Sequence, residues 1–253
     1  MVCLSLATKA WWRTAYACIL VVSIAIAFRL MQSNQKRLDL TRVQRLFIGG
    51  AAFVGAMLGS KVPFLGDRGW GAFYDGTVWF ADGKTILGGI VGGYAAVEFA
   101  KWIANIRTRT GDTFALPVAI AVAIGRVGCF IAGCCFGRVT TVPWGVSFPM
   151  AHDAPGILRH PTQLYEVAFH FGAALALMIM DRKRWFVGNQ LKAYLIAYMV
   201  YRFLSEWLRP ESPILLDLTI YQIVSVAITA ILLILWVRDS RELLPTVHTP
   251  KVA

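Results

Sequence analysis

Long apolar segments recur along the chain, and shorter polar stretches separate them. A helix needs about 20 mostly apolar residues to cross the hydrocarbon of a bilayer. The pattern therefore predicts an all-α polytopic membrane protein of about seven transmembrane helices, near residues 14–31, 44–64, 85–105, 114–136, 163–180, 189–208 and 214–237. We interpret residues 1–253 as a single transmembrane domain with outer loops at 66–84 and 137–161.

Basic residues between these segments predict an orientation. With the N-terminus placed outside, fifteen lie in or beside the inner segments: Arg29, Lys36, Arg37, Arg42, Arg45, Lys101, Arg107, Arg109, Arg182, Lys183, Arg184, Lys192, Arg238, Arg241 and Lys251. Seven lie on the other side: Lys9, Arg13, Arg68, Lys84, Arg138, Arg159 and Arg209. Membrane proteins concentrate Lys and Arg in their cytoplasmic loops. The distribution of the basic residues therefore indicates a protein that lies in a lipid bilayer with its C-terminus in the cytoplasm. The net charge of +11 reflects this orientation and does not indicate a nucleic acid partner.

The first apolar segment has a second interpretation. Lys9 and Arg13 precede it, and residues 25–27 (Ala-Ile-Ala) resemble the cleavage site of a signal peptide. The strongly basic stretch that follows opposes export of the remaining chain. A retained first helix is therefore the favoured prediction.

Composition changes the picture only slightly. Hydrophobic residues make up 57% of the chain and charged residues only 15%, against about 25% charged in soluble domains. No zinc-binding spacing or phosphate-binding glycine loop is present, so we expect no metal and no cofactor. The five cysteines are Cys3, Cys18, Cys129, Cys134 and Cys135. For the cluster of Cys129, Cys134 and Cys135, three interpretations stay open, namely buried thiols, a disulfide and a reactive thiol.

Ionisable residues inside the predicted spans are the main candidates for function, because each costs several kcal/mol in hydrocarbon unless it is paired or wet. The six candidate residues are Lys61, Glu98, Arg126, Glu166, Arg202 and Glu206. The predicted orientation places all except Glu98 toward the outer side. We therefore expect a site at that depth.

Two arginines stand out among these residues. Arg126 lies between Gly125 and Gly128, which would let a bulky ligand approach, and a guanidinium group matches phosphate oxygens in a fork. Arg202 and Glu206 are four residues apart and share a helix face. They form either a structural ion pair or a pair in which Glu206 positions Arg202 for an anionic ligand.

The most specific motifs of the chain are residues 125–138, GRVGCFIAGCCFGR, and residues 160–166, HPTQLYE. Together they resemble the signatures of one known family, the bacterial prolipoprotein diacylglyceryl transferases. Weaker matches follow the family's order along the chain: Ala15-Tyr16-Ala17, Gly88-Gly89-Ile90-Val91-Gly92-Gly93, Arg202-Phe203 with Glu206 and Arg209, and Tyr221-Gln222.

The resemblance implies transfer of a diacylglyceryl group from phosphatidylglycerol to the lipobox cysteine of prolipoproteins, which bind through their signal peptides. It also implies a bacterial inner membrane and a site that opens outward. The implied catalytic residues are Arg126, Arg202 and Glu206. The implied substrate-binding residues are Tyr16, Gly88, Gly89, Cys129, Gly137, His160, Gln163, Tyr165, Glu166 and Arg209. For Gly88 and Gly89, close helix packing is the alternative interpretation. For His160, the alternative is a cap on the fifth helix.

This chain departs from the family pattern at three positions. Many members have asparagine at the position of Cys129 and an acidic residue at that of Cys134, and some have histidine where Leu87 stands. The general base proposed for those members is therefore missing. Three interpretations stay open: Glu166 is the base instead, the positive field of the arginines suffices alone, or the activity has changed. A related transferase with another acceptor and a non-catalytic phospholipid-binding or transport protein are the alternative functions.

Overall fold

The computed structural model describes residues 2–68, 85–148, 151, 154 and 156–243, and within them it is helical without a β-strand. Most of the predicted loop 66–84 lies outside the described residues. The described chain divides into two compact units, one of residues 1–30 and 110–253, the other of residues 31–109. The all-α prediction is confirmed.

Seven α-helices occur in the described residues, and six are long and apolar enough to cross a membrane. They are α1 (Val2–Gln35), α2 (Arg42–Arg68), α5 (Ile86–Ile103), α6 (Asp112–Ile131), α7 (Thr162–Arg182) and α9 (Ile220–Leu243). The other helix, α8 (Gln190–Ser205), has 16 residues and continues as the 3₁₀ turn η2 (Glu206–Leu208). At 1.5 Å per residue α8 covers only about 24 Å. The described residues therefore contain six candidate membrane spans, and a seventh span stays a prediction.

Helix α6 ends five residues before the predicted limit of 136, and Gly133 is the reason. Gly133 has φ +67°, and its amide donates to the carbonyl of Phe130 at 3.0 Å. The next amide, of Cys134, donates to the carbonyl of Cys129 at 3.1 Å. These two bonds form a Schellman motif, which satisfies the last carbonyl groups and turns the chain away from the helix axis.

Helix α9 begins six residues after the predicted limit of 214, because Thr219 and Gln222 form a capping box. The Thr219 amide donates to Gln222 Oε1 at 3.0 Å, and the Gln222 amide donates to Thr219 Oγ1 at 3.3 Å. Thr41 and Gln44 make the same exchange at the start of α2. Such boxes satisfy amides that have no partner within a helix.

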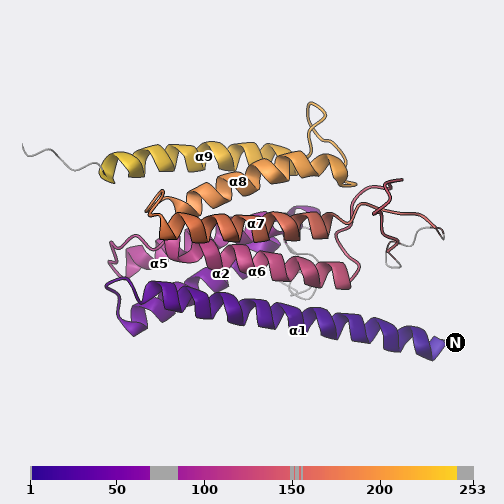
Figure 1. The fold of residues 1–253 in the computed structure, drawn as a ribbon, viewed down its shortest axis with the longest axis horizontal. Helices are drawn as coiled ribbons and strands as arrows, with labels where there is room; N and C mark the ends of the chain where they lie inside the picture. The colour runs from indigo at the N-terminus through magenta and orange to yellow at the C-terminus, as the bar shows by residue number, and fades with distance from the viewer. Residues whose placement is uncertain (1, 69–84, 149–150, 152–153, 155, 244–253) are drawn as a thin grey trace, which may run out of the picture. The chain divides into compact units, whose positions relative to one another are not determined.

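In the first unit, α6 packs against α7 and α8 against α9, and the four helices run side by side (Figure 1). Helix α1 lies against α6, where the Ser23 hydroxyl donates to the Ala121 carbonyl at 2.8 Å. At the start of α8, the Asp112 carboxylate accepts from the amide of Gln190 at 2.9 Å. The starts of α6 and α8 therefore lie side by side. At the opposite end of the unit, the end of α6 meets the start of α7, and the end of α8 meets the start of α9.

In the second unit, α2 and α5 pack so closely that their backbones touch. A Cβ added to Gly92 would collide with the Gly55 carbonyl oxygen and lie 2.8 Å from Gly59 Cα. A Cβ on Gly88 would likewise collide with the Gly59 carbonyl oxygen. Glycine on both helices therefore permits this approach, as in other membrane helix pairs.

Candidate functional site

Glu166, in the second turn of α7, is the centre of one charged cluster in the first unit. Its side chain is fully buried. Oε2 accepts from Arg126 Nη2 at 2.7 Å and from Arg209 Nη2 at 3.0 Å, and Oε1 accepts from the Tyr198 hydroxyl at 2.7 Å. One carboxylate thus holds guanidinium groups from α6 and from the segment after η2. Pairing of this kind offsets the cost of burying each charge.

Arg202 and Glu206 form a second charged cluster where α8 passes into η2. Arg202 Nη2 donates to Glu206 Oε2 at 2.8 Å, and the Thr219 hydroxyl donates to Glu206 Oε1 at 3.1 Å. The Arg202 guanidinium also lies 5.6 Å from the centre of the Tyr221 ring. Arg202 therefore contacts both a carboxylate and an aromatic ring.

The two clusters bury more positive than negative charge. They contain three guanidinium groups and two carboxylates, so one positive charge is left over. Three buried guanidinium nitrogens, Arg126 Nε, Arg202 Nη1 and Arg209 Nε, have no hydrogen-bond partner among the described residues. Buried donors without partners are costly and call for an explanation such as a ligand. The arrangement suits an anion with several acceptor oxygens.

Three cysteine sulfurs gather beside Arg126. Cys129 lies in the last turn of α6, and Cys134 and Cys135 lie in the loop after Gly133. The three Sγ atoms all lie within 4.8 Å of one another. Hydrogen bonds from Cys129 and Cys134 lower the pKa of the Cys135 thiol below its ordinary value. Burial raises this pKa, and the positive charge of Arg126 lowers it. Hydrogen bonds with Cys129 and Cys135 raise the pKa of Cys134.

The HPTQLYE stretch forms the opposite side of this loop. Gln163 is fully buried, and its Nε2 donates to the Cys134 carbonyl at 2.6 Å. The Tyr165 hydroxyl accepts from Trp144 Nε1 at 2.8 Å and lies 3.2 Å from His160 Nδ1. Tyr165 therefore contacts two residues of the loop 137–161, His160 and Trp144. The N-cap residue of α7 is Pro161, and the Thr162 amide in the first turn donates to the His160 carbonyl at 2.9 Å, so the capping interpretation of His160 stays a prediction.

Gly137 and Tyr16 also lie in the first unit. The Gly137 amide donates to the His160 carbonyl at 2.8 Å, and a Cβ there would lie 2.6 Å from the Leu208 carbonyl oxygen. Gly137 therefore allows the loop to pass close to the end of η2. Tyr16 is half-buried on α1, and a Cβ on Gly128 would be 3.2 Å from its ring. The side chain of Tyr16 thus faces the helix that carries Arg126.

Gly88, Gly89 and Lys61 belong to the second unit. Gly88 faces the α2 backbone, which agrees with the packing interpretation, and a Cβ on Gly89 would lie 3.4 Å from the Ala56 carbonyl oxygen. A contact of either glycine with a lipid headgroup stays a prediction. Lys61 is buried near the end of α2, and Leu87 is buried in the first turn of α5.

Sequence reasoning missed three buried residues of the first cluster: Tyr198, Tyr194 and His170. The Tyr194 hydroxyl lies 2.9 Å from His170 Nδ1, and the His170 ring packs against the Tyr198 ring at 4.8 Å between centres. A signal was present, because His170 follows Glu166 by four residues and Tyr198 precedes Arg202 by four. Side chains at that spacing share a helix face.

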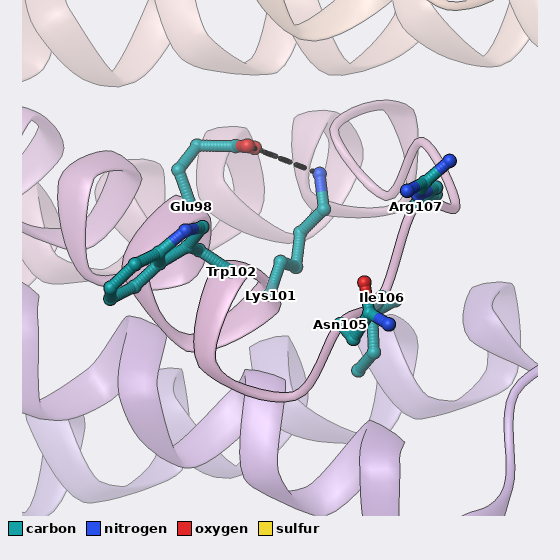
Figure 2. A pocket seen from close by; sticks show the side chains of 6 residues that line it. All are labelled: Glu98, Lys101, Trp102, Asn105, Ile106 and Arg107. Atoms are coloured by element: carbon teal, nitrogen blue, oxygen red, sulfur yellow. Dashed lines mark hydrogen bonds and ion pairs between the residues drawn. The ribbon is translucent and has the colours of Figure 1, made fainter.

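A separate pocket of about 570 Å³ lies in the second unit, at the end of α5. Figure 2 shows Glu98 and Lys101 on α5 and Arg107 on the loop that follows. Lys101 Nζ pairs with Glu98 Oε1 at 3.0 Å, and the Glu98 side chain is 50% exposed. Glu98 is therefore a solvated partner of Lys101. Of the residues predicted to form the site, none lines this pocket.

The fold and the charged clusters define a class, namely a multi-pass helical membrane protein that buries arginines and carboxylates at one end of a helix bundle. The family model for prolipoprotein diacylglyceryl transferase matches residues 8–238. The chain therefore belongs to the prolipoprotein diacylglyceryl transferase family.

Individual relatives agree with this assignment. The phosphatidylglycerol–prolipoprotein diacylglyceryl transferase of Wolbachia sp. subsp. Brugia malayi is 30% identical over 245 residues, which cover 89% of each chain. That of Coxiella burnetii is 31% identical over 221 residues, covering 80% of this chain and 78% of the relative. Transferase 2 of Clostridium perfringens is 31% identical over 166 residues, covering 62% of this chain and 64% of the relative.

Proposed function

We propose that this protein transfers a diacylglyceryl group from phosphatidylglycerol to the lipobox cysteine of prolipoproteins. Family membership and the names of the relatives support this proposal. The observation that carries it in the structure is the set of unpartnered nitrogens on Arg126, Arg202 and Arg209. Three guanidinium groups with free donors and one surplus positive charge suit the phosphate of a phospholipid headgroup.

In the proposed reaction the thiol releases its proton to solvent, and its sulfur attacks the carbon of the diacylglyceryl group that is joined to the phosphate oxygen. The carbon–sulfur bond forms, the carbon–oxygen bond breaks, and glycerol phosphate leaves. Negative charge develops on the leaving phosphate, and Arg126 and Arg202 stabilise it there. Buried, preorganised donors of this kind are worth about 10²–10³ in rate when one is removed.

The carboxylates have a positioning role in this proposal. Both Glu166 oxygens already accept hydrogen bonds, from Arg126, Arg209 and Tyr198. Those bonds favour the negatively charged carboxylate, so Glu166 suits the role of anchor for the arginines better than that of general base. Glu206 holds Arg202 in the same way. Gln163 and Gly137 support the loop beside the site, and Tyr16, His160 and Tyr165 are proposed to contact the substrates.

For the membrane arrangement, we propose seven spans with α8 as the sixth in order, an outer N-terminus and a cytoplasmic C-terminus. The concentration of basic residues in the predicted inner loops supports this orientation. The charged clusters lie at the ends of α6 and α8 and the starts of α7 and α9. With this topology the site opens toward the outer face of the bacterial inner membrane.

The test follows the mass of a lipobox peptide incubated with phosphatidylglycerol and the purified protein in detergent. We expect a diacylglyceryl mass gain, reduced at least about 100-fold in Arg126→Ala, since that change removes a charged donor from the leaving phosphate. Arg238→Ala is the matched control, because Arg238 is 64% exposed in its side chain and pairs with Asp239.

Melting curves of both variants show whether the fold survives. Full activity in a folded Arg126→Ala protein would contradict the proposed role of Arg126. Phospholipid binding by the wild type without any mass gain would contradict transfer to lipobox peptides. That result would instead indicate another acceptor or a phospholipid-binding protein.

A further inference from the structure

The three sulfurs of Cys129, Cys134 and Cys135 are spaced as metal ligands are. All lie within 4.8 Å of one another, and the Cys134 and Cys135 sulfurs are 3.8 Å apart. A metal ion bound at about 2.3 Å by each of three thiolates holds them about 4 Å apart. Inward shifts of less than about 1 Å would therefore complete such a set. The spacing along the sequence did not predict it, because the turn at Gly133 creates it.

The backbone holds these sulfurs in position. The Schellman motif sets Cys134 over Cys129, and Cys135 adopts φ +62°, a conformation that residues with a Cβ seldom take. Gln163 and Thr162 at the start of α7 donate to the Cys134 and Cys135 carbonyls at 2.6 and 3.0 Å. Hydrogen bonds therefore hold the end of α6 and the loop that carry the three thiols, which lowers the cost of organising the thiols around an ion.

The surroundings fit an anionic complex. Three thiolates and one divalent ion carry a net charge of −1. Arg126 interacts electrostatically with both Cys129 and Cys135, and Arg209 interacts with Cys135. Cys135 is exposed and the other two thiols are half-buried, so an ion from solution has access.

We propose that Cys129, Cys134 and Cys135 form a binding site for a thiophilic divalent d¹⁰ metal ion, zinc or cadmium, with three thiolate ligands and an open fourth position. Soft thiolate ligands select such ions over magnesium and calcium. Binding replaces three S–H protons with three metal–sulfur bonds, and the protons pass to solvent. No electron transfer is involved, and affinity rises with pH because the ligands must be deprotonated.

The experiment uses the full-length protein in detergent, reduced, stripped of metal with a chelator and desalted. Cadmium chloride is titrated while the ultraviolet thiolate-to-metal charge-transfer band is recorded. We expect saturation at one ion per chain. Cys134→Ser should weaken binding at least about tenfold, because two thiolates remain. Cys18→Ser is the matched control and should bind like the wild type, since Cys18 is a free, exposed cysteine outside the cluster.

A second measurement keeps the test decisive if Cys134→Ser does not fold. The wild-type protein is alkylated with and without cadmium, and peptide masses show which cysteines react. Protection of Cys129, Cys134 and Cys135 together, with Cys18 unprotected, supports the site. The absence of a saturable band in the wild type, an equal band in folded Cys134→Ser, or alkylation of all three cysteines in the presence of cadmium would overturn it.

Discussion

The α2–α5 pair and the charged end of the α6–α9 bundle join helices in opposite ways. In the pair, glycine brings backbone against backbone, with Gly92 of α5 set against Gly55 and Gly59 of α2. In the bundle, the buried carboxylate of Glu166 binds guanidinium groups from two other segments. Glycine has no side chain, so the contact between these backbones adds no ionisable group. The charged end leaves donors on Arg126 and Arg202 unused. Its stability and its capacity to bind therefore come from the same residues.

Glu166→Ala should disrupt the charged cluster around Glu166 and cause the largest loss of stability among these changes. It removes the acceptor that Arg126 and Arg209 share, and leaves two buried cations without it. Loss of one partner of a buried pair costs about 3–5 kcal/mol. A thermal melt in detergent measures the loss, and diacylglyceryl transfer should fall with it. An unchanged melting temperature would show that Glu166 does not stabilise the bundle.

Gly92→Ala should weaken the packing of α2 against α5, with a smaller loss of stability than Glu166→Ala. The added methyl group meets backbone atoms of Gly55 and Gly59, which cannot move aside as a side chain can. Overpacking of this kind costs about 1–3 kcal/mol. Gly50→Ala is the matched control in α2, since nothing lies within 4 Å of a Cβ there, and it should cost nothing. The comparison fails if the melting temperatures of the two variants agree.

Glu98→Gln should have the smallest effect and so sharpens the contrast with Glu166. Both residues are predicted to lie in spans and both pair with a cation. Glu98 is 50% exposed in its side chain, whereas Glu166 is fully buried. An exposed pair contributes about 0–1 kcal/mol. We expect a melting temperature close to that of the wild type, and a loss as large as that of Glu166→Ala would refute the distinction.

The helices themselves were predictable, because apolar segments long enough to span a bilayer are a strong signal. Several boundaries were misplaced, and at two of them, the end of α6 and the start of α9, the signal was local. Gly133 ends α6, and the Thr219–Gln222 box starts α9 inside what had been predicted as one apolar segment. Hydropathy cannot detect such signals, because they depend on one or two residues in a particular backbone conformation.

The charged site was predictable only in part. Burial cost alone singled out Arg126, Glu166, Arg202 and Glu206, and spacing four residues apart indicated the pair of Arg202 with Glu206. The partners of Glu166 were not predictable in this way. Arg209 is 43 positions from Glu166 in the sequence, and only the packing of α6 and α7 with the turn after α8 brings the three segments together.

One hydroxyl group links the start of α9 to the position of Arg202. Thr219 Oγ1 accepts from the Gln222 amide and donates to Glu206, which binds Arg202. The first turn of α9 and the orientation of the Arg202 guanidinium are therefore mechanically coupled. An anion that draws Arg202 away from Glu206 would change the hydrogen bond between Glu206 and the Thr219 hydroxyl. Fraying at the beginning of α9 would then report, from outside the site, whether the arginine is occupied.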